Sequence, residues 1–197
     1  MKILMIGGTG NISYPASQAL VARGEDVILY NRGNHPMAGA RQVIGDRYDN
    51  AAFEQDMAAL LAKEGHIDVV IDMICFHPEH GRAVQRALGG KIGQYIFCST
   101  VDVYTKTKSG YPIREDFERE PNPAFEYAYH KAILEKELEA AARQGHPDGR
   151  RMAASMRDLK LPPGYVEAGL AENEIRCGVS GGTAIGTSCW KDSKPLW

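Results

Sequence analysis

A tyrosine and a lysine four residues apart, Tyr127 and Lys131, form a pair that could move a proton. On a helix, residues at this spacing share a face, so the ammonium can lie beside the phenol. A free tyrosine has a pKa of about 10, which is too high for an efficient base at neutral pH. Because a nearby cation favours the phenolate, we expect a lowered pKa and a general acid/base role for Tyr127. The spacing also arises by chance on helix surfaces, and Tyr129 is a second tyrosine on the same helix.

Two hydroxyl side chains, Ser99 and Thr100, come directly after an apolar run that predicts a strand. Open parallel sheets bind their ligands at the carboxyl ends of the strands. A hydroxyl there could hold a substrate oxygen while Tyr127 transfers a proton. The alternative is a hydroxyl pair that caps a turn. The hydroxyls and the tyrosine together favour a catalytic site.

Residues 2–23 predict a buried strand, a glycine-rich turn and a helix, in that order. The first amides of a helix are unpaired and carry a partial positive charge, which suits a pyrophosphate. We expect Gly8 to allow the tight turn, Gly10 to let the backbone approach the phosphates, and the small Ser13 to let the helix pack on the strand. Such loops also serve as plain turns, but the flanking strand and helix favour a dinucleotide site.

The residues after the second predicted strand bear on which dinucleotide binds. A carboxylate at this point accepts from the ribose 2′-hydroxyl of NAD, whereas an arginine accommodates the 2′-phosphate of NADP. The chain has Asn31 and Arg32 there and no carboxylate. Arg32 could pair with a phosphate, which favours NADP over NAD, and a solvated loop arginine is the alternative.

Strand and helix patterns alternate over the first two-thirds of the chain. Strands are predicted at residues 2–6, 27–30, 42–44, 67–74 and 94–98, and helices at residues 11–23, 51–63, 78–88 and 125–143. Near-continuous apolar strands between amphipathic helices indicate a parallel sheet covered on both faces. The predicted fold class is therefore α/β, a Rossmann-like doubly wound parallel sheet.

Composition and charge narrow the function classes. The 197 residues are 44% hydrophobic and 24% charged, as in ordinary globular proteins, and the net charge is −2. We therefore expect no nucleic-acid or membrane partner. Cys75 and Cys98 lie in or beside apolar runs without a CxxC spacing, and no apolar run reaches membrane-spanning length. We expect reduced thiols, no signal peptide and a cytoplasmic location. Residues 77–80 fit no standard zinc motif, so a helix start is expected there instead of a metal site.

Three motifs together resemble the extended short-chain dehydrogenase/reductase family, and its NAD-dependent epimerase/dehydratase branch most of all. They are Gly7-Gly8-Thr9-Gly10-Asn11-Ile12-Ser13, Cys98-Ser99-Thr100-Val101-Asp102-Val103-Tyr104, and Tyr127-Ala128-Tyr129-His130-Lys131 with Glu135. They occur in the family's order on the expected elements, and the resemblance covers roughly residues 1–146.

The resemblance assigns roles to individual residues. Thr100, with Ser99 beside it, matches the catalytic hydroxyl; Tyr127 matches the general acid/base; and Lys131 matches the residue that binds the nicotinamide ribose. Asp46 matches the residue that hydrogen-bonds the adenine, and the backbone of Asp72 and Met73 is expected to line the cofactor. The full set expected to bind the cofactor is Gly7, Gly8, Thr9, Gly10, Asn11, Ile12, Asn31, Arg32, Asp46, Asp72, Met73, Tyr127 and Lys131.

The pattern changes after residue 146. Family members continue with another strand and a smaller substrate-binding domain, whereas residues 147–197 contain no apolar strand of useful length and at most one helix, over residues 165–175. We expect a Rossmann domain at residues 1–146 and an irregular tail at residues 147–197. The hypothesis is a truncated or frame-shifted gene whose tail is not family sequence, so that the substrate pocket would be incomplete and turnover in doubt.

Three functions are consistent with these motifs. The first is an NAD(P)-dependent epimerase, dehydratase or reductase acting on a nucleotide sugar or a similar hydroxyl or keto compound. The second is a non-catalytic dinucleotide-binding module. The third follows a plant branch of the family that binds RNA stem-loops and also carries Asn-Arg-Gly after the second strand, although the net charge of −2 argues against it. The resemblance also implies a homodimer through the helices at 78–88 and 127–143.

Overall fold

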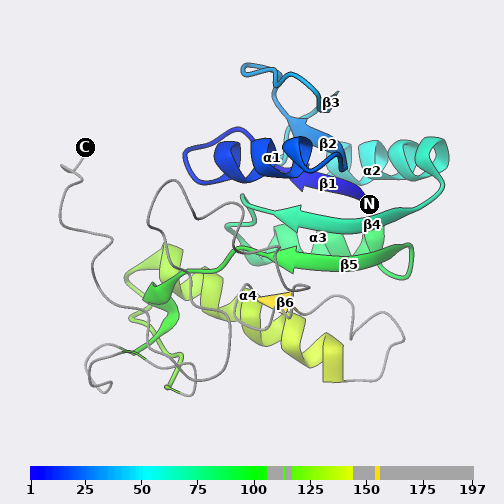
Figure 1. Cartoon of the computed structure of the whole chain (residues 1–197). Coiled ribbons are helices and arrows are strands. Elements are labelled where there is room, and N and C mark those ends of the chain that lie inside the picture. The colour runs from blue at the N-terminus through cyan, green and yellow to red at the C-terminus, as the bar shows by residue number, and fades with distance from the viewer. Residues whose placement is uncertain (106–112, 114–116, 144–153, 156–197) are drawn as a thin grey trace.

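The apolar run at the amino terminus forms a central strand of a parallel sheet (Figure 1). The computed structural model describes residues 1–105, 113, 117–143 and 154–155. The strand order is β3-β2-β1-β4-β5-β6, and every pairing is parallel. The elements are β1 Lys2–Ile6, α1 Ser13–Ala22, β2 Asp26–Asn31, β3 Arg41–Ile44, α2 Asn50–Glu64, β4 Ile67–Asp72, α3 Pro78–Leu88, β5 Ile92–Phe97, the 3-10 turn η1 Val101–Val103, α4 Glu126–Arg143 and β6 Ala154–Ser155. The predicted doubly wound α/β fold is confirmed.

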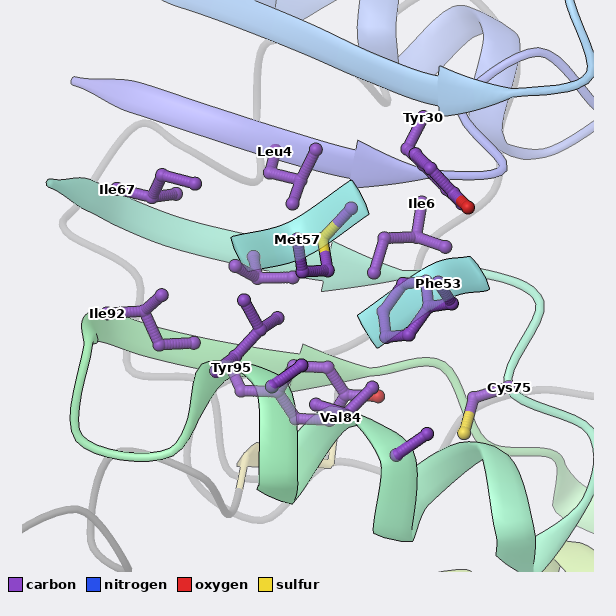
Figure 2. Packing of buried hydrophobic residues seen from close by; sticks show 14 of the residues in the cluster. Leu4, Ile6, Tyr30, Phe53, Met57, Ile67, Cys75, Val84, Ile92 and Tyr95 are labelled. Carbon is purple, nitrogen blue, oxygen red and sulfur yellow. The ribbon is translucent and has the colours of Figure 1, made fainter. Parts of the chain in front are cut away.

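Side chains of each central strand alternate between two apolar layers. Leu4 and Ile6 of β1 point to the layer formed by α2, α3 and α4, where Phe53 and Tyr95 are also buried (Figure 2). Ile3 and Met5 point to the opposite layer, which α1 covers. β1 and β2 are thus buried on both faces, which is why these two strands are nearly continuous apolar runs instead of alternating with polar residues.

The order of the strands reverses between β1 and β4, so the loops after these two strands diverge at the carboxyl edge of the sheet. The backbone ladder continues one residue into each loop. The N–H of Gly7 donates to Tyr30 O at 2.9 Å, that of Met73 to Ile6 O at 3.0 Å, and that of Cys98 to Asp72 O at 3.1 Å. These bonds hold the loops that carry the candidate site residues at one edge.

Two strands differ from the sequence prediction. β4 ends at Asp72, before Met73 and Ile74, because the N–H of Ile74 donates to the Asp72 carboxylate at 3.1 Å instead of to a neighbouring strand. In addition, a two-residue strand, β6, pairs with β5 at Phe97 in a region where we expected none. The rest of the predicted tail, including the helix at 165–175, lies outside the described residues.

Two further expectations concern thiols and membranes. Cys75 and Cys98 are free thiols, and burial raises the pKa of Cys75 to about 12. In the part of the chain that the structure describes, no helix has both the length and the apolar character needed to cross a bilayer.

Candidate functional site

The glycine loop between β1 and α1 divides its tasks differently from the prediction. Gly7, not Gly8, has the left-handed backbone of the tight turn, with φ +82°. A Cβ on Gly8 would lie 2.7 Å from Leu29 Cδ2 and 2.8 Å from Ser17 Oγ, so Gly8 is needed for close packing. A Cβ on Gly10 would meet only Ser13 Oγ, at 3.4 Å. The backbone at Gly10 is therefore open to a ligand.

Two buried serines of α1 hold this loop in place. Ser13 Oγ accepts from the N–H of Gly10 at 2.8 Å and donates to Gly7 O at 2.7 Å. Ser17 Oγ donates to Gly8 O at 2.8 Å. Sequence reasoning treated Ser13 only as a small residue and did not single out Ser17. Each hydroxyl satisfies a backbone group that the turn would otherwise leave buried without a partner.

The amino terminus of α1 presents free donors. No side chain caps the helix, and its first turn carries no acidic residue. Among the described residues, the N–H groups of Asn11 and Ile12 have no hydrogen-bond acceptor, and Ile12 is 66% exposed. Unpaired amides at a helix start form an anion site. This geometry fits an anionic group such as a pyrophosphate.

The end of β2 is organised around Asn31. Its Oδ1 accepts from Gln42 Nε2 at 2.6 Å and from the N–H of Gly33 at 2.8 Å. The amide nitrogen is therefore directed toward the glycine loop, 3.4 Å from Thr9 Oγ1. Arg32 is exposed and pairs with none of the described residues. The end of β2 therefore presents an amide donor and a guanidinium in place of the carboxylate that would accept from a ribose 2′-hydroxyl.

Asp46 and Asp72, both predicted near the cofactor, lie in different surroundings. Asp46 is exposed after β3, and one carboxylate oxygen accepts from the N–H of Tyr48 at 2.9 Å. The Asp72 side chain is fully buried and accepts from Tyr95 Oη at 3.1 Å. Only the backbone of Asp72, with that of Met73, remains at the sheet edge. The structure therefore allows Asp46, but not Asp72, to reach a ligand with its side chain.

Arg47 is a residue that sequence reasoning missed. It is 2% exposed, and its Nη2 lies 3.3 Å from Asp72 Oδ2 and donates to His80 O at 2.8 Å. The guanidinium carbon lies 4.1 Å from the centre of the Phe53 ring. Arg47 thus joins the loop after β3 to the β4–α3 region beneath the sheet edge. The available signal was Asp72 itself, because a carboxylate in an apolar strand needs a buried partner.

Tyr127 and Thr100 meet at the carboxyl edge, as predicted. The Thr100 side chain lies beside the Tyr127 phenol and lowers its pKa against the effect of burial, and Tyr127 is 40% exposed, so the phenol is accessible. Thr100 is the first residue before η1 and also accepts from the N–H of Asp102 at 3.3 Å. Ser99 Oγ is buried and has no partner among the described residues. The structure thus brings Thr100 and Tyr127 together, whereas Ser99 Oγ makes no hydrogen bond to the tyrosine.

Lys131 lies beneath the phenol in an aromatic enclosure. It is 1% exposed, and its ammonium donates to Cys98 O at 2.6 Å. The nitrogen lies 4.5 Å from the centre of the Phe97 ring, 5.0 Å from that of Phe76 and 5.8 Å from that of Tyr127. Aromatic faces attract a buried cation, so these rings partly replace the water that Lys131 has lost. Phe76, from the loop after β4, carried no sequence signal for this role.

The electrostatics of the pair differ from the expectation. Burial raises the pKa of Tyr127 above 10 instead of lowering it, and burial also lowers the pKa of Lys131. The ammonium reaches the tyrosine only across its ring and gives its hydrogen bond to a carbonyl. The expected lowering of the Tyr127 pKa by Lys131 is therefore wrong for the protein alone, in which Tyr127 is a phenol at neutral pH.

Residues 77–80, for which a helix start was expected instead of a metal site, lie at the start of α3. Pro78 begins α3, as expected for a helix start, and His77 Nδ1 lies 3.2 Å from His130 Nδ1. Within the described residues, no three His, Cys, Asp or Glu side chains gather closely enough to hold a metal ion. Glu135, the last residue of the tyrosine motif, is buried and paired with Arg119 at 2.7 Å.

Residues 81–152 match the model of the NAD dependent epimerase/dehydratase family. A curated relative, the chloroplast stem-loop binding protein of 41 kDa b from Arabidopsis thaliana, is 35% identical over 120 residues, which are 54% of this chain and 31% of the relative. The chain thus spans about a third of that protein's length.

Solved structures with the same fold include a UDP-glucose 4-epimerase, with a TM-score of 0.61 and 21% identity over 74% of this chain and 49% of that one. Another is the UDP-glucose-4-epimerase of Stenotrophomonas maltophila with bound NAD and formylated UDP-arabinopyranose, with a TM-score of 0.61, 20% identity and the same coverage. The chain spans about half of each. Residues 81–152 therefore match the family that the sequence motifs predict, and the solved structures share the Rossmann-like fold of this chain.

Proposed function

We propose that this chain binds a nicotinamide dinucleotide and uses Tyr127 to exchange a proton with a substrate hydroxyl or carbonyl. The observation that carries the proposal is the convergence at one sheet edge of the free amides of α1 and the adjacent side chains of Thr100 and Tyr127. A bound dinucleotide supplies a hydride donor or acceptor. Similar folds in complexes with NAD and UDP-sugars support a nucleotide sugar as the substrate class.

Each residue of the site would have one task. The amides of Asn11 and Ile12 would bind the pyrophosphate, while Asp46 and the donors at the end of β2 would bind the adenosine. Thr100 would hold the substrate oxygen, and Tyr127 would give or take its proton. Because Lys131 is enclosed by aromatic rings, we expect it to hold the Tyr127 ring in position from the buried side. We expect its ammonium to reach a ribose hydroxyl only if Phe76 shifts.

The choice of dinucleotide depends on Arg32. Its exposed guanidinium and the amide of Asn31 favour the 2′-phosphate of NADP, because both are donors. Calorimetric titration with NADP and NAD tests this. We expect tighter binding of NADP, and we expect Arg32→Ala to remove the difference while leaving NAD affinity unchanged. Equal affinity for both in the unaltered chain would contradict the NADP assignment without affecting dinucleotide binding itself.

The catalytic assignment can be tested with two tyrosines on the same helix. Tyr127 and Tyr129 are 40% and 38% exposed, and only Tyr127 contacts Thr100. The assay follows nicotinamide absorbance during incubation with UDP-sugars. Tyr127→Phe should lower turnover by about 100-fold or more while dinucleotide affinity is kept, since general acid/base catalysis contributes about that much. Tyr129→Phe should behave like the unaltered chain. Equal effects of both substitutions would contradict the role of Tyr127.

Two alternatives have specific support. Dinucleotide binding without turnover is the result expected if residues 147–197 do not form a substrate-binding region. Stem-loop binding is suggested by the name of the Arabidopsis thaliana relative, and an electrophoretic shift assay with an RNA stem-loop tests it.

The homodimer through α3 and α4 remains a prediction, to be checked by light scattering. Arg82 and Arg86 on the exposed side of α3 already pair with Glu137 and Glu54, so the interface would be polar.

A further inference from the structure

We infer that Phe76 is a positioning residue that controls access to the Lys131 ammonium, and that a contact between His77 and His130 holds the Phe76 ring over that ammonium. The catalytic meaning of this arrangement rests on the proposed function, because Lys131 is the residue expected to reach a ribose hydroxyl of the dinucleotide. Its structural content is the enclosure of Lys131 and the contact between the two imidazoles.

One wall of the enclosure around Lys131 belongs to a loop. The ammonium donates to Cys98 O at 2.6 Å and lies 4.5 Å from the centre of the ring of Phe97, the last residue of β5. Tyr127 is on the same helix as Lys131, so regular secondary structure holds both of these rings. Phe76, with its ring centre 5.0 Å from the ammonium, is instead a partly buried residue of the loop between β4 and α3. Phe76 is therefore the ring best placed to open a path from Lys131 to the sheet edge.

The loop that carries Phe76 is attached to both neighbouring helices. The N–H of Phe76 donates to Nδ1 of His80, in α3, at 3.3 Å. His77 places its Nδ1 3.2 Å from Nδ1 of His130, the residue directly before Lys131 in α4. At this distance one imidazole donates and the other accepts, so at least one of the two is neutral. The pair thus ties the loop to the helix that carries the ammonium.

A dinucleotide must compete with this closed arrangement. The ammonium can bond a ribose hydroxyl only after it leaves Cys98 O and Phe76 moves aside. When the binding-competent state is only a fraction of the population, the apparent affinity falls by that fraction. Loss of the contact between His77 and His130 should therefore tighten dinucleotide binding, which is the opposite of what damage to the fold would do.

The experiment measures how fast the Lys131 amine of the full chain reacts with acetic anhydride before any dinucleotide is added. Mass spectrometry gives the rate relative to that of Lys136, which is exposed on the same helix. The variants are His77→Ala, His77→Asn, Phe76→Ala and the double variant of His77→Ala with Phe76→Ala. Asn is the conservative replacement, because its amide lies near the position of Nδ1 and still donates or accepts. His66→Ala is the matched control, because His66 is an exposed histidine before β4, at the opposite edge of the sheet.

We expect His77→Ala to raise the relative rate at Lys131 by about 3- to 10-fold, the factor by which one lost hydrogen bond shifts an equilibrium. His77→Asn and His66→Ala should react like the unaltered chain. Phe76→Ala should raise the rate at least as much as His77→Ala does, and the double variant should react no faster than Phe76→Ala. Circular dichroism confirms that each variant is folded. No acceleration in His77→Ala, the same acceleration in His77→Asn or His66→Ala, or additive effects in the double variant would overturn the inference.

Calorimetric titration with a dinucleotide separates this inference from the proposed function. His77→Ala should bind the dinucleotide more tightly than the unaltered chain, by about the factor seen in the reaction rate. Unchanged or weaker binding by His77→Ala would overturn the inference. If the unaltered chain and every variant fail to bind, the proposed function is wrong, whereas the reaction rates at Lys131 still decide whether Phe76 and His77 control access to it.

Discussion

Removing one partner of the buried pair Arg47 and Asp72 should be the most destabilising single polar change in this fold. The two side chains are 1% and 0% exposed, and Asp72 also accepts from Tyr95 Oη and the N–H of Ile74. Asp72→Asn keeps the shape, but its amide oxygen can replace only one of these two acceptors, and the guanidinium is left buried without a counter-charge. Breaking such a pair costs about 3–5 kcal/mol. For a domain of this size, that lowers the melting temperature by roughly 10 °C.

The assay is urea unfolding followed by circular dichroism, arranged as a double-mutant cycle. Arg47→Met removes the other charge, and the double variant removes both. We expect the double variant to be less destabilised than the sum of the single changes, by about 2 kcal/mol or more, because neither charge is then left alone. The matched control is Asp26→Asn, which affects the exposed pair with Arg41 and should cost under about 1 kcal/mol.

Two outcomes would refute this reasoning. One is an effect of Asp72→Asn no larger than that of Asp26→Asn. The other is strict additivity of the single changes, which would mean that Arg47 and Asp72 contribute independently and that the burial of the pair has no electrostatic consequence.

Two further predictions concern the glycine loop and acid stability. Gly8→Ala should lower the free energy of unfolding by about 1–3 kcal/mol because its Cβ meets packed atoms. Gly10→Ala should instead fold normally and lose dinucleotide affinity. Urea unfolding measures the first effect and calorimetry the second, and equal unfolding free energies of the two variants would contradict the prediction. Burial lowers the pKa of His80 to about 4 from an ordinary value of 6.5, so the unfolded chain binds more protons between these values and stability should fall by about 3 kcal/mol from pH 6.5 to 4. In His80→Gln that part of the acid dependence should vanish, and unchanged acid unfolding curves would rule His80 out as its source.

Much of the fold could be predicted from local patterns. Apolar runs located β1, β2, β4 and β5, and the proline at the start of α3 marked its first residue. The Tyr127 and Lys131 spacing placed both side chains on one helix, and the hydroxyl of Thr100 was expected beside the phenol. These features depend on residues close together in the sequence, or on the rule that parallel strands end at a common edge, so composition and spacing were sufficient.

The tertiary structure alone decided how the polar groups are paired. Asp72 turns into the core toward Arg47, although the two are 25 residues apart. Phe76 reaches Lys131 from a different loop, and burial raises the pKa of Tyr127 where the spacing of Tyr127 and Lys131 predicts a fall. Which side chains lie at the sheet edge follows from the order of strands and loops along the chain. Their direction, burial and pKa values depend on packing between distant segments, because solvent exclusion and hydrogen-bond geometry arise only when those segments meet.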